Sequence, residues 1–240
     1  MLQLSVILPA FNEGAKIGQD LKACFDFFSR EPYQTEILVV SDGSTDDTDS
    51  QATKAMKWPA GQVRGKLVSY SLNRGKGFAI RKGVEAARGE RILFMDVGLC
   101  VPLKCLGLGL EKLREGYDFA VGSRRLNASV VRRKQRAYRR AGSRIFNWMI
   151  SQTMGIGLVL DAQCGFKLYR REAAKKIFSK VRCDGFMFDV EALREAKRMG
   201  FVGAEFPVEW SNDGDTRYDP IFGTLRNLRE LLKIRFERRT

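Results

Sequence analysis

The residues best suited to chemistry stand directly after short apolar runs of the kind that form buried β-strands. Asp96 follows the apolar residues 92–95, Asp42 follows 36–40, and the pair Asn12 and Glu13 closes a run at 4–8. Ligands of an open α/β sheet bind outside the carboxyl ends of its strands, so we expect these groups to share one edge. Carboxylate and amide groups there can form hydrogen bonds with a base and a ribose.

The segment 74–77 adds a different chemistry, because it reads Arg-Gly-Lys-Gly and leads into an expected helix. Cations, closely approaching backbone and a helix start together suit a diphosphate. The loop after the first strand lacks the G-x-G-x-x-G pattern, which argues against a dinucleotide. Each loop alone is more often an ordinary turn, whereas loops of this kind on successive strand ends favour a nucleotide ligand.

The elements that must position these loops alternate regularly between strand and helix. Apolar runs predict strands at 4–8, 36–40, 66–70, 92–95 and 119–121, and helical spacing predicts helices between them. This alternation predicts an α/β fold with a doubly wound, mostly parallel sheet. A late edge strand is expected at 204–210. We expect a single domain at 1–222, with a helical insertion at about 124–160, and a basic amphipathic helix at 223–240.

Composition excludes several classes of function. The 240 residues include no His, which removes His-based hydrolase triads and zinc–histidine sites. The five Cys form no C-x-x-C pair and read as reduced intracellular thiols. No apolar run reaches the roughly 18 residues of a membrane-spanning helix, so we expect a cytoplasmic protein that does not cross a membrane.

A net charge of +14 indicates an anionic partner, and its distribution narrows the choice. The segment 119–160 contains no acidic residue, and its cationic middle is followed by an apolar stretch that contains Trp148. This stretch reads equally well as a buried helix pair or as an interfacial helix on a membrane. The C-terminal helix could likewise dock on the core or on lipid. Modules that recognise nucleic acid are absent, so lipid fits the pattern better than nucleic acid.

Seven ordered motifs carry a family resemblance over about 4–210. They read VILPAFNE, VVSDGSTDDT, LNRGKGFAIRKGV, ILFMDVG, VGSRR, DAQCGFKLYRREAA and GFMFDVEALREAKRMGFVGAEFPVEW. The chain resembles glycosyltransferase family two, of GT-A fold, and within it the polyprenyl-phosphate sugar transferases. The resemblance implies inverting transfer of a hexose from a nucleotide sugar to a polyprenyl (dolichyl or undecaprenyl) phosphate at the cytoplasmic face of a membrane. DAQCGFKLY is closer to the branch that uses UDP-glucose, and a GDP-mannose-dependent enzyme is the alternative.

The same resemblance implies three groups of site residues. The expected nucleotide-binding residues are Pro9, Ala10, Asn12, Glu13, Asp42, Lys76 and Asp96. The expected acceptor- and sugar-binding residues are Arg124, Arg139, Ser143, Gln163, Asp189 and Glu191. Asp96, Arg124 and Arg139 form the expected catalytic set. A lipid phosphate is already an anion, so the reaction needs positioning and charge stabilisation rather than a strong base, in agreement with a chain that lacks His.

Gly98 departs from the family pattern at the expected metal site. Asp96 matches the first carboxylate of the D-x-D motif, but Gly98 occupies the position of the second. The thiol of Cys100 is too soft to replace an oxygen ligand of Mg²⁺. Three alternatives follow: weaker binding of Mg²⁺ or Mn²⁺, neutralisation of the diphosphate by Arg and Lys, or a degenerate homologue that binds nucleotide sugar or lipid without turnover.

Overall fold

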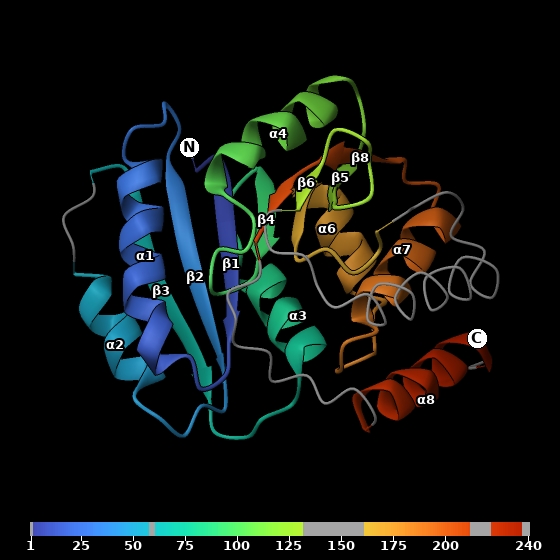
Figure 1. Ribbon diagram of the computed structural model, residues 1–240, viewed down its shortest axis with the longest axis horizontal. Coiled ribbons are helices and arrows are strands. Elements are labelled where there is room, and N and C mark those ends of the chain that lie inside the picture. The colour runs from blue at the N-terminus through green and yellow to red at the C-terminus, as the bar shows by residue number, and fades with distance from the viewer. Residues whose placement is uncertain (1, 58–60, 132–160, 212–221, 237–240) are drawn as a thin grey trace.

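The fold is built on a central sheet with helices on both faces. The computed structural model describes residues 2–57, 61–131, 161–211 and 222–236. In this part of the chain, seven strands form a sheet in the order β3-β2-β1-β4-β7-β5-β8 (Figure 1). Its strands are β1 (Leu4–Ala10), β2 (Thr35–Asp42), β3 (Val63–Tyr70), β4 (Arg91–Met95), β5 (Phe119–Ser123), β7 (Phe166–Arg170) and β8 (Gly203–Pro207). A smaller sheet pairs β6 (Val130–Val131) with β9 (Glu209–Trp210).

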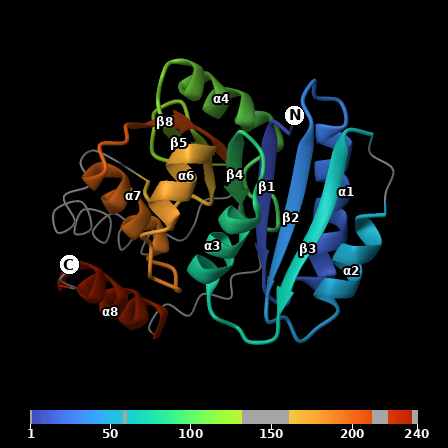
Figure 2. The same cartoon turned by 180° about the vertical axis from the view of Figure 1, so that it is seen from behind.

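The helices divide between the two faces of this sheet. They are α1 (Gly14–Phe28), α2 (Thr48–Ala55), α3 (Lys76–Ala86), α4 (Leu106–Arg114), α6 (Arg171–Phe178), α7 (Phe188–Arg198) and α8 (Phe222–Phe236), with a 3-10 turn at Leu103–Cys105. Helices α3, α6 and α7 cover one face of the sheet, and α1, α2 and α4 cover the other (Figure 2). Buried side chains of the first group, with those of α8, form one core cluster, and those of the second group form another. Because both faces are covered, the inner strands are apolar almost throughout.

The expected alternation of strand and helix is confirmed from β1 to β5. The parallel register places Ala10 beside Ser41 and Val6 beside Leu93, so the carboxyl ends of β1, β2 and β4 lie at one edge. One strand differs from simple parallel winding. β7 runs antiparallel between β4 and β5, which the sequence did not predict. The expected strand at 204–210 is interrupted at Val208, so that β8 extends the large sheet and β9 pairs with β6.

Helix α8 lies at the periphery, beside α7 (Figure 1). It is anchored by Leu231 and Ile234, which are buried in the core cluster on its side of the sheet. Its observed start at Phe222 agrees with the expected C-terminal helix, and the division into a domain at 1–222 and an appended helix stays a prediction. Most of the expected insertion, 132–160, lies outside the described residues. Among the described helices, none has the length and apolar character needed to cross a bilayer.

Candidate active site

The loops after β1 and β2 are joined by hydrogen bonds. The backbone amide of Thr45 donates to Oδ1 of Asn12 at 2.8 Å, and the amide of Asn12 donates to Oγ of Ser44 at 3.0 Å. Asn12 has a φ of 53°, in the left-handed region where Asn is among the better tolerated residues. The amide of Glu13 donates to Oγ1 of Thr48 at 2.8 Å. The structure therefore brings Asn12 and Glu13 next to the loop that follows Asp42, with Pro9 and Ala10 just before them in β1.

Asp42 organises the neighbouring loop. Its buried carboxylate accepts hydrogen bonds from the amides of Arg74 and Gly75, both at 2.8 Å, and from Nδ2 of Asn73 at 3.1 Å. Gly75 has a φ of 108°, and a side chain there would bring Cβ within 2.4 Å of the carbonyl oxygen of Asp184. Both oxygens of Asp42 are thus engaged by the chain itself. Its expected contact with a base stays a prediction, whereas its role in shaping this loop is observed.

Lys76 begins helix α3 and meets the carboxylate of Asp96 at the end of β4. The distance from Nζ to Oδ1 of Asp96 is 2.6 Å, and the two side chains are 21% and 38% exposed. Burial lowers the pKa of Lys76, but the carboxylates of Asp96 and Asp189 outweigh burial, and the net pKa is raised. Lys76 is therefore a cation throughout the physiological pH range. The sequence placed both residues near a diphosphate but did not predict this direct contact, and their binding of a nucleotide stays a prediction.

The backbone at the start of α3 is less available to a phosphate than the sequence indicated. The amides of Gly77 and Phe78 both donate to the carbonyl oxygen of Asp184, at 2.8 and 3.3 Å. These are N–H groups that a helix start would otherwise offer to an anion. The side-chain ammonium of Lys76 is then the stronger feature of this loop for binding a diphosphate.

Asp96 is fitted against Gly165, on the loop that leads into β7. The amide of Asp96 donates to the carbonyl oxygen of Gly165 at 3.2 Å, which extends the pairing of β4 and β7 by one residue. A Cβ at Gly165 would stand 2.0 Å from Oδ2 of Asp96. Only glycine allows this approach. Among the described residues, Asp96 and Gly165 line a small hollow together with Cys100 and Trp210.

Asp189 forms a buried ion pair with Lys167, a residue that the sequence analysis did not identify. Nζ of Lys167 lies 2.7 Å from Oδ1 of Asp189 and also donates to the carbonyl oxygen of Cys164 at 2.6 Å. Burial raises the pKa of Asp189, and the nearby cations of Lys167 and Lys76 only partly oppose it. The available signal was a lysine inside the otherwise apolar run that became β7.

Glu191 and Gln163 were also expected at the sugar pocket. Glu191 is buried, and its Oε2 accepts hydrogen bonds from the amides of Arg182 and Cys183 at 3.0 and 2.7 Å. It therefore stabilises the turn before α7. Gln163 is half-buried on the loop between Asp161 and β7. Contacts of these two residues with a sugar stay predictions.

Arg124 forms a two-pronged ion pair with Asp161, which the sequence analysis also missed. Nε and Nη2 of Arg124 lie 2.7 and 2.8 Å from the two oxygens of Asp161, and the amide of Arg124 donates to Oδ2 at 2.9 Å. Burial raises the pKa of Asp161, but Arg124 outweighs it and the pKa is lowered. Asp161 is fully buried, whereas the Arg124 side chain is 26% exposed and its guanidinium lies 5.5 Å from the ring of Trp210. Arg139 and Ser143 lie outside the described residues.

The loop at Gly98 does not form a carboxylate cage. Gly98 has a φ of 90° and Leu99 a φ of 43°, and the amide of Gly98 donates to Oδ2 of Asp20 at 2.5 Å. Across the described parts of the chain, no group of three or more Cys, Asp or Glu side chains is arranged to hold a metal ion. The described residues therefore do not fit a divalent metal held in the manner of a complete D-x-D motif.

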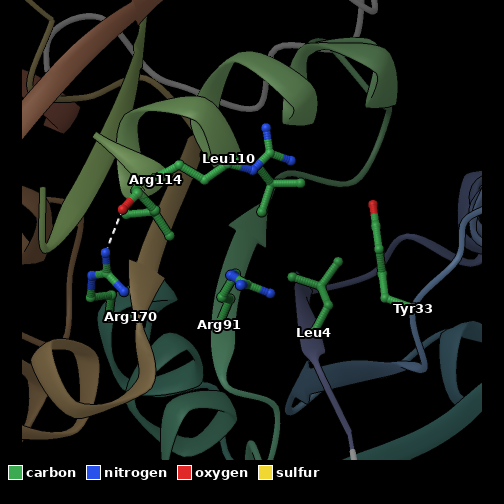
Figure 3. Close-up of a pocket in the computed structure, with 7 residues that line it drawn as sticks. Leu4, Tyr33, Arg91, Leu110, Arg114 and Arg170 are labelled. Carbon is green, nitrogen blue, oxygen red and sulfur yellow. Dashed lines mark hydrogen bonds between the residues drawn. The ribbon is translucent and has the colours of Figure 1, made fainter. Parts of the chain in front are cut away.

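A larger cavity, of about 170 Å³, lies at the opposite edge of the sheet (Figure 3). It is bordered by Leu4 and Arg91, which begin β1 and β4, and by Tyr33 and Arg114. This cavity lies at the amino ends of the strands, away from the loops that follow their carboxyl ends. The candidate site is consequently at the Lys76–Asp96 edge and not in this cavity.

The central sheet, with helices on both faces and polar loops at its strand ends, has the GT-A fold. Solved structures of glucosyl-3-phosphoglycerate synthase from Mycobacterium tuberculosis share this fold: one in complex with phosphoglyceric acid has a TM-score of 0.69, at 21% identity, covering 98% of this chain and 80% of that one. Another, in complex with Mg²⁺ and UDP, has a TM-score of 0.65 at 20% identity, covering 98% and 79%. The chain belongs to glycosyl transferase family 2, whose sequence profile matches residues 5–178.

Curated relatives extend over nearly the whole chain. The dolichyl-phosphate beta-glucosyltransferase of Homo sapiens is 32% identical over 97% of this chain and 75% of its own length. The dolichyl-phosphate beta-glucosyltransferase of Dictyostelium discoideum is 29% identical over 98% of this chain and 74% of its own length. The expected family and fold are thus confirmed, and the protein is a glycosyltransferase.

Proposed function

We propose that this glycosyltransferase transfers glucose from UDP-glucose to a polyprenyl phosphate, such as dolichyl or undecaprenyl phosphate, with inversion at the anomeric carbon. The single observation that carries the proposal is the meeting of Lys76 and Asp96 at 2.6 Å, at the strand edge where nucleotides bind in open α/β sheets. The names of the relatives support glucose and a lipid phosphate as the substrates.

The reaction makes modest demands on the side chains. An oxygen of the lipid phosphate attacks C1 of the sugar while the bond from C1 to the diphosphate breaks, and UDP leaves with the bonding electrons. The acceptor oxygen is already an anion, so no proton must be removed before attack. The protein must hold the two partners in line and stabilise negative charge on the leaving diphosphate. The ammonium of Lys76, fixed by Asp96, is placed to supply that charge.

Arg124 is proposed to bind the acceptor phosphate. Asp161 occupies Nε and Nη2 of its guanidinium, which fixes the orientation of the group. A guanidinium has five N–H donors, so others remain to form hydrogen bonds with a phosphate. Arg139 and Ser143 are proposed to act with it, by the family resemblance. Asp189, Gln163 and Glu191 are proposed to border the sugar.

The reaction is proposed to take place at a membrane surface. Among the described elements, α8 is the one proposed to contact the lipid. Leu228, Leu232 and Phe236 recur every four residues on this helix and are exposed. Exposed Arg229 and Arg235 lie on either side of this apolar stripe. An exposed apolar face bordered by cations suits an anionic membrane interface. All five cysteines are free thiols, which supports the cytoplasmic face.

A donor screen tests the proposal. Purified full-length protein would be given UDP-glucose, GDP-mannose or another nucleotide sugar, with dolichyl or undecaprenyl phosphate in vesicles, and the glycolipid product would be measured. We expect product with UDP-glucose. Product with GDP-mannose alone would establish the mannosyltransferase alternative instead.

A second candidate function is favoured by one observation. Gly98 replaces a carboxylate of the family motif, so a degenerate homologue could bind nucleotide sugar or lipid without turnover. Binding of UDP-glucose without product, for every acceptor in the screen, would support this binding protein over the enzyme.

A further inference from the structure

We infer that the ammonium of Lys76 takes the place of the divalent cation in this site, so that the nucleoside diphosphate binds without Mg²⁺ or Mn²⁺. The inference rests on the proposed function, because it requires a nucleoside diphosphate at the Lys76–Asp96 edge. It concerns how this chain neutralises the diphosphate, which the family resemblance alone does not decide.

The first step is the position of the ammonium. Nζ of Lys76 lies 2.6 Å from Oδ1 of Asp96, the carboxylate at the first position of the D-x-D motif. The cation that Asp96 contacts in this structure is therefore part of the chain. A lysine ammonium is an established type of phosphate ligand.

The second step is the conformation at Gly98. Its φ of 90° is readily adopted by glycine and is strained for residues with a Cβ. Its amide donates to Oδ2 of Asp20 in helix α1, which ties this part of the loop to the face of the sheet. The backbone conformation at this position therefore suits glycine and would be strained for an Asp that supplied a second carboxylate.

The third step is that other nearby carboxylates already have cationic or amide partners. Asp161 is bound by Arg124 through two hydrogen bonds from the guanidinium. Asp189 is bound by the buried ammonium of Lys167 at 2.7 Å. Recruiting either one to a metal ion would break a buried ion pair, and the broken pair would leave an uncompensated charge.

Charge repulsion disfavours neutralisation of the diphosphate by a metal ion and Lys76 together. A Mg²⁺ ion binds a carboxylate oxygen at about 2.0–2.1 Å and requires nearly octahedral oxygen ligands. A metal on Asp96 would therefore lie beside the ammonium of Lys76, which contacts the same carboxylate. Two cations bound to the same carboxylate repel each other, and one carboxylate supplies few ligands to offset the repulsion. The ammonium of Lys76 balances the charge of Asp96 and leaves N–H donors for the diphosphate.

Calorimetric titration of the full-length protein with UDP and with GDP, in EDTA or in Mg²⁺, tests the inference. We expect the dissociation constant of the nucleotide that binds to differ by less than about twofold between the two conditions. Binding seen only with Mg²⁺ or Mn²⁺ would overturn the inference and leave the proposed function standing. If neither UDP nor GDP binds, in EDTA or in Mg²⁺, the proposed function is overturned, and the inference with it.

A matched pair of variants assigns the effect to Lys76. Lys76→Gln is expected to weaken nucleotide binding in EDTA by about tenfold to a hundredfold, the value of one charge-assisted hydrogen bond. Lys82→Gln is the control, because Lys82 lies on the same helix but is exposed and paired with Glu85. Equal affinities of the Lys76 variant and the wild type would overturn the inference, and circular dichroism would verify that both variants are folded.

Manganese binding gives a readout that is independent of nucleotide affinity. Electron paramagnetic resonance would compare the Mn²⁺ bound in a mixture of protein and UDP with that bound by the same amount of UDP alone. We expect equal amounts. Additional Mn²⁺ bound in the presence of wild-type protein, and lost in Asp96→Asn, would show a protein metal site and overturn the inference.

Discussion

Removing Arg124 should affect stability before it affects catalysis, because its partner Asp161 is fully buried. The structure gives Asp161 three hydrogen bonds from Arg124, two of them from the guanidinium. In Arg124→Ala the backbone bond can persist, but the cation is lost. A carboxylate then remains in the interior without a counter-charge, which is the costly way to break a buried pair.

The expected cost of Arg124→Ala is about 3–5 kcal/mol at neutral pH, the range measured when one partner of a buried ion pair is deleted. Total stability of a folded domain is only about 5–15 kcal/mol, so this loss is large. It would lower the apparent activity of the variant even if Arg124 never contacts an acceptor. A simple loss of transfer in Arg124→Ala would therefore not establish the acceptor role.

The pH dependence of the stability loss in Arg124→Ala should show that the unpaired Asp161 carboxylate causes it. In the wild type Arg124 holds the pKa of Asp161 below its usual value, so this pair stabilises the fold above the unfolded pKa and less at lower pH. In Arg124→Ala, burial is opposed only by the backbone hydrogen bond and by the charge of Arg125, so the pKa of Asp161 should rise above the unfolded value. The destabilisation of the variant then grows as pH rises from the unfolded-state pKa of Asp161 to its raised folded-state pKa. The stability gap between variant and wild type should be larger at about pH 7.5 than at about pH 5.

Urea denaturation at the two pH values, followed by circular dichroism, measures this gap. A free energy of unfolding within about 1 kcal/mol of the wild type at pH 7.5 would refute the reasoning, as would a gap that widens at pH 5. The double variant Arg124→Ala/Asp161→Asn separates stability from function, because the neutral amide oxygen can still accept the backbone hydrogen bond. We expect it to recover most of the stability, to bind UDP normally, and to transfer glucose at least about a hundredfold more slowly.

Three further predictions follow from other contacts. Gly165→Ala should slow transfer by about tenfold to a hundredfold in a glycolipid assay, because its Cβ would displace the carboxylate of Asp96; an unchanged rate would contradict this. Leu232→Gln should weaken co-sedimentation with vesicles containing anionic lipid by about tenfold, whereas Leu108→Gln, the same change at an exposed leucine of α4, should not. Lys167→Met should cost about 3–5 kcal/mol in urea denaturation, because it leaves a buried carboxylate unpaired, and a cost below about 1 kcal/mol would count against that pairing.

The fold was predictable where each element carries its own signal. The strands β1, β2 and β4 are covered on both faces, so their sequences are nearly continuous apolar runs. β7 lacked such a signal, because Lys167 interrupts it and its antiparallel place between β4 and β5 is decided by distant partners. Helix α6, which follows it directly, was missed.

The candidate site was predictable in its location but not in its internal contacts. Asn12, Asp42 and Asp96 could be placed at one edge, because parallel strands align their carboxyl ends. The sequence could not show that Asp42 holds the loop at 73–75. Nor could it show which cations neutralise which buried carboxylates, since such pairs join segments that are distant along the chain. Their selection depends on the packed fold rather than on spacing.

Gly98 shows how a sequence departure and a structural contact combine. The missing carboxylate is visible in the sequence, but it supports weak metal binding, metal-independent transfer and loss of catalysis equally well. The structure adds a positive φ at Gly98, an amide held by Asp20, and an ammonium 2.6 Å from Asp96. A site that had merely lost a ligand would leave Asp96 without a counter-charge at this edge. The pairing with Lys76 instead provides a cation from the protein itself, as the proposed metal-independent binding of the diphosphate requires.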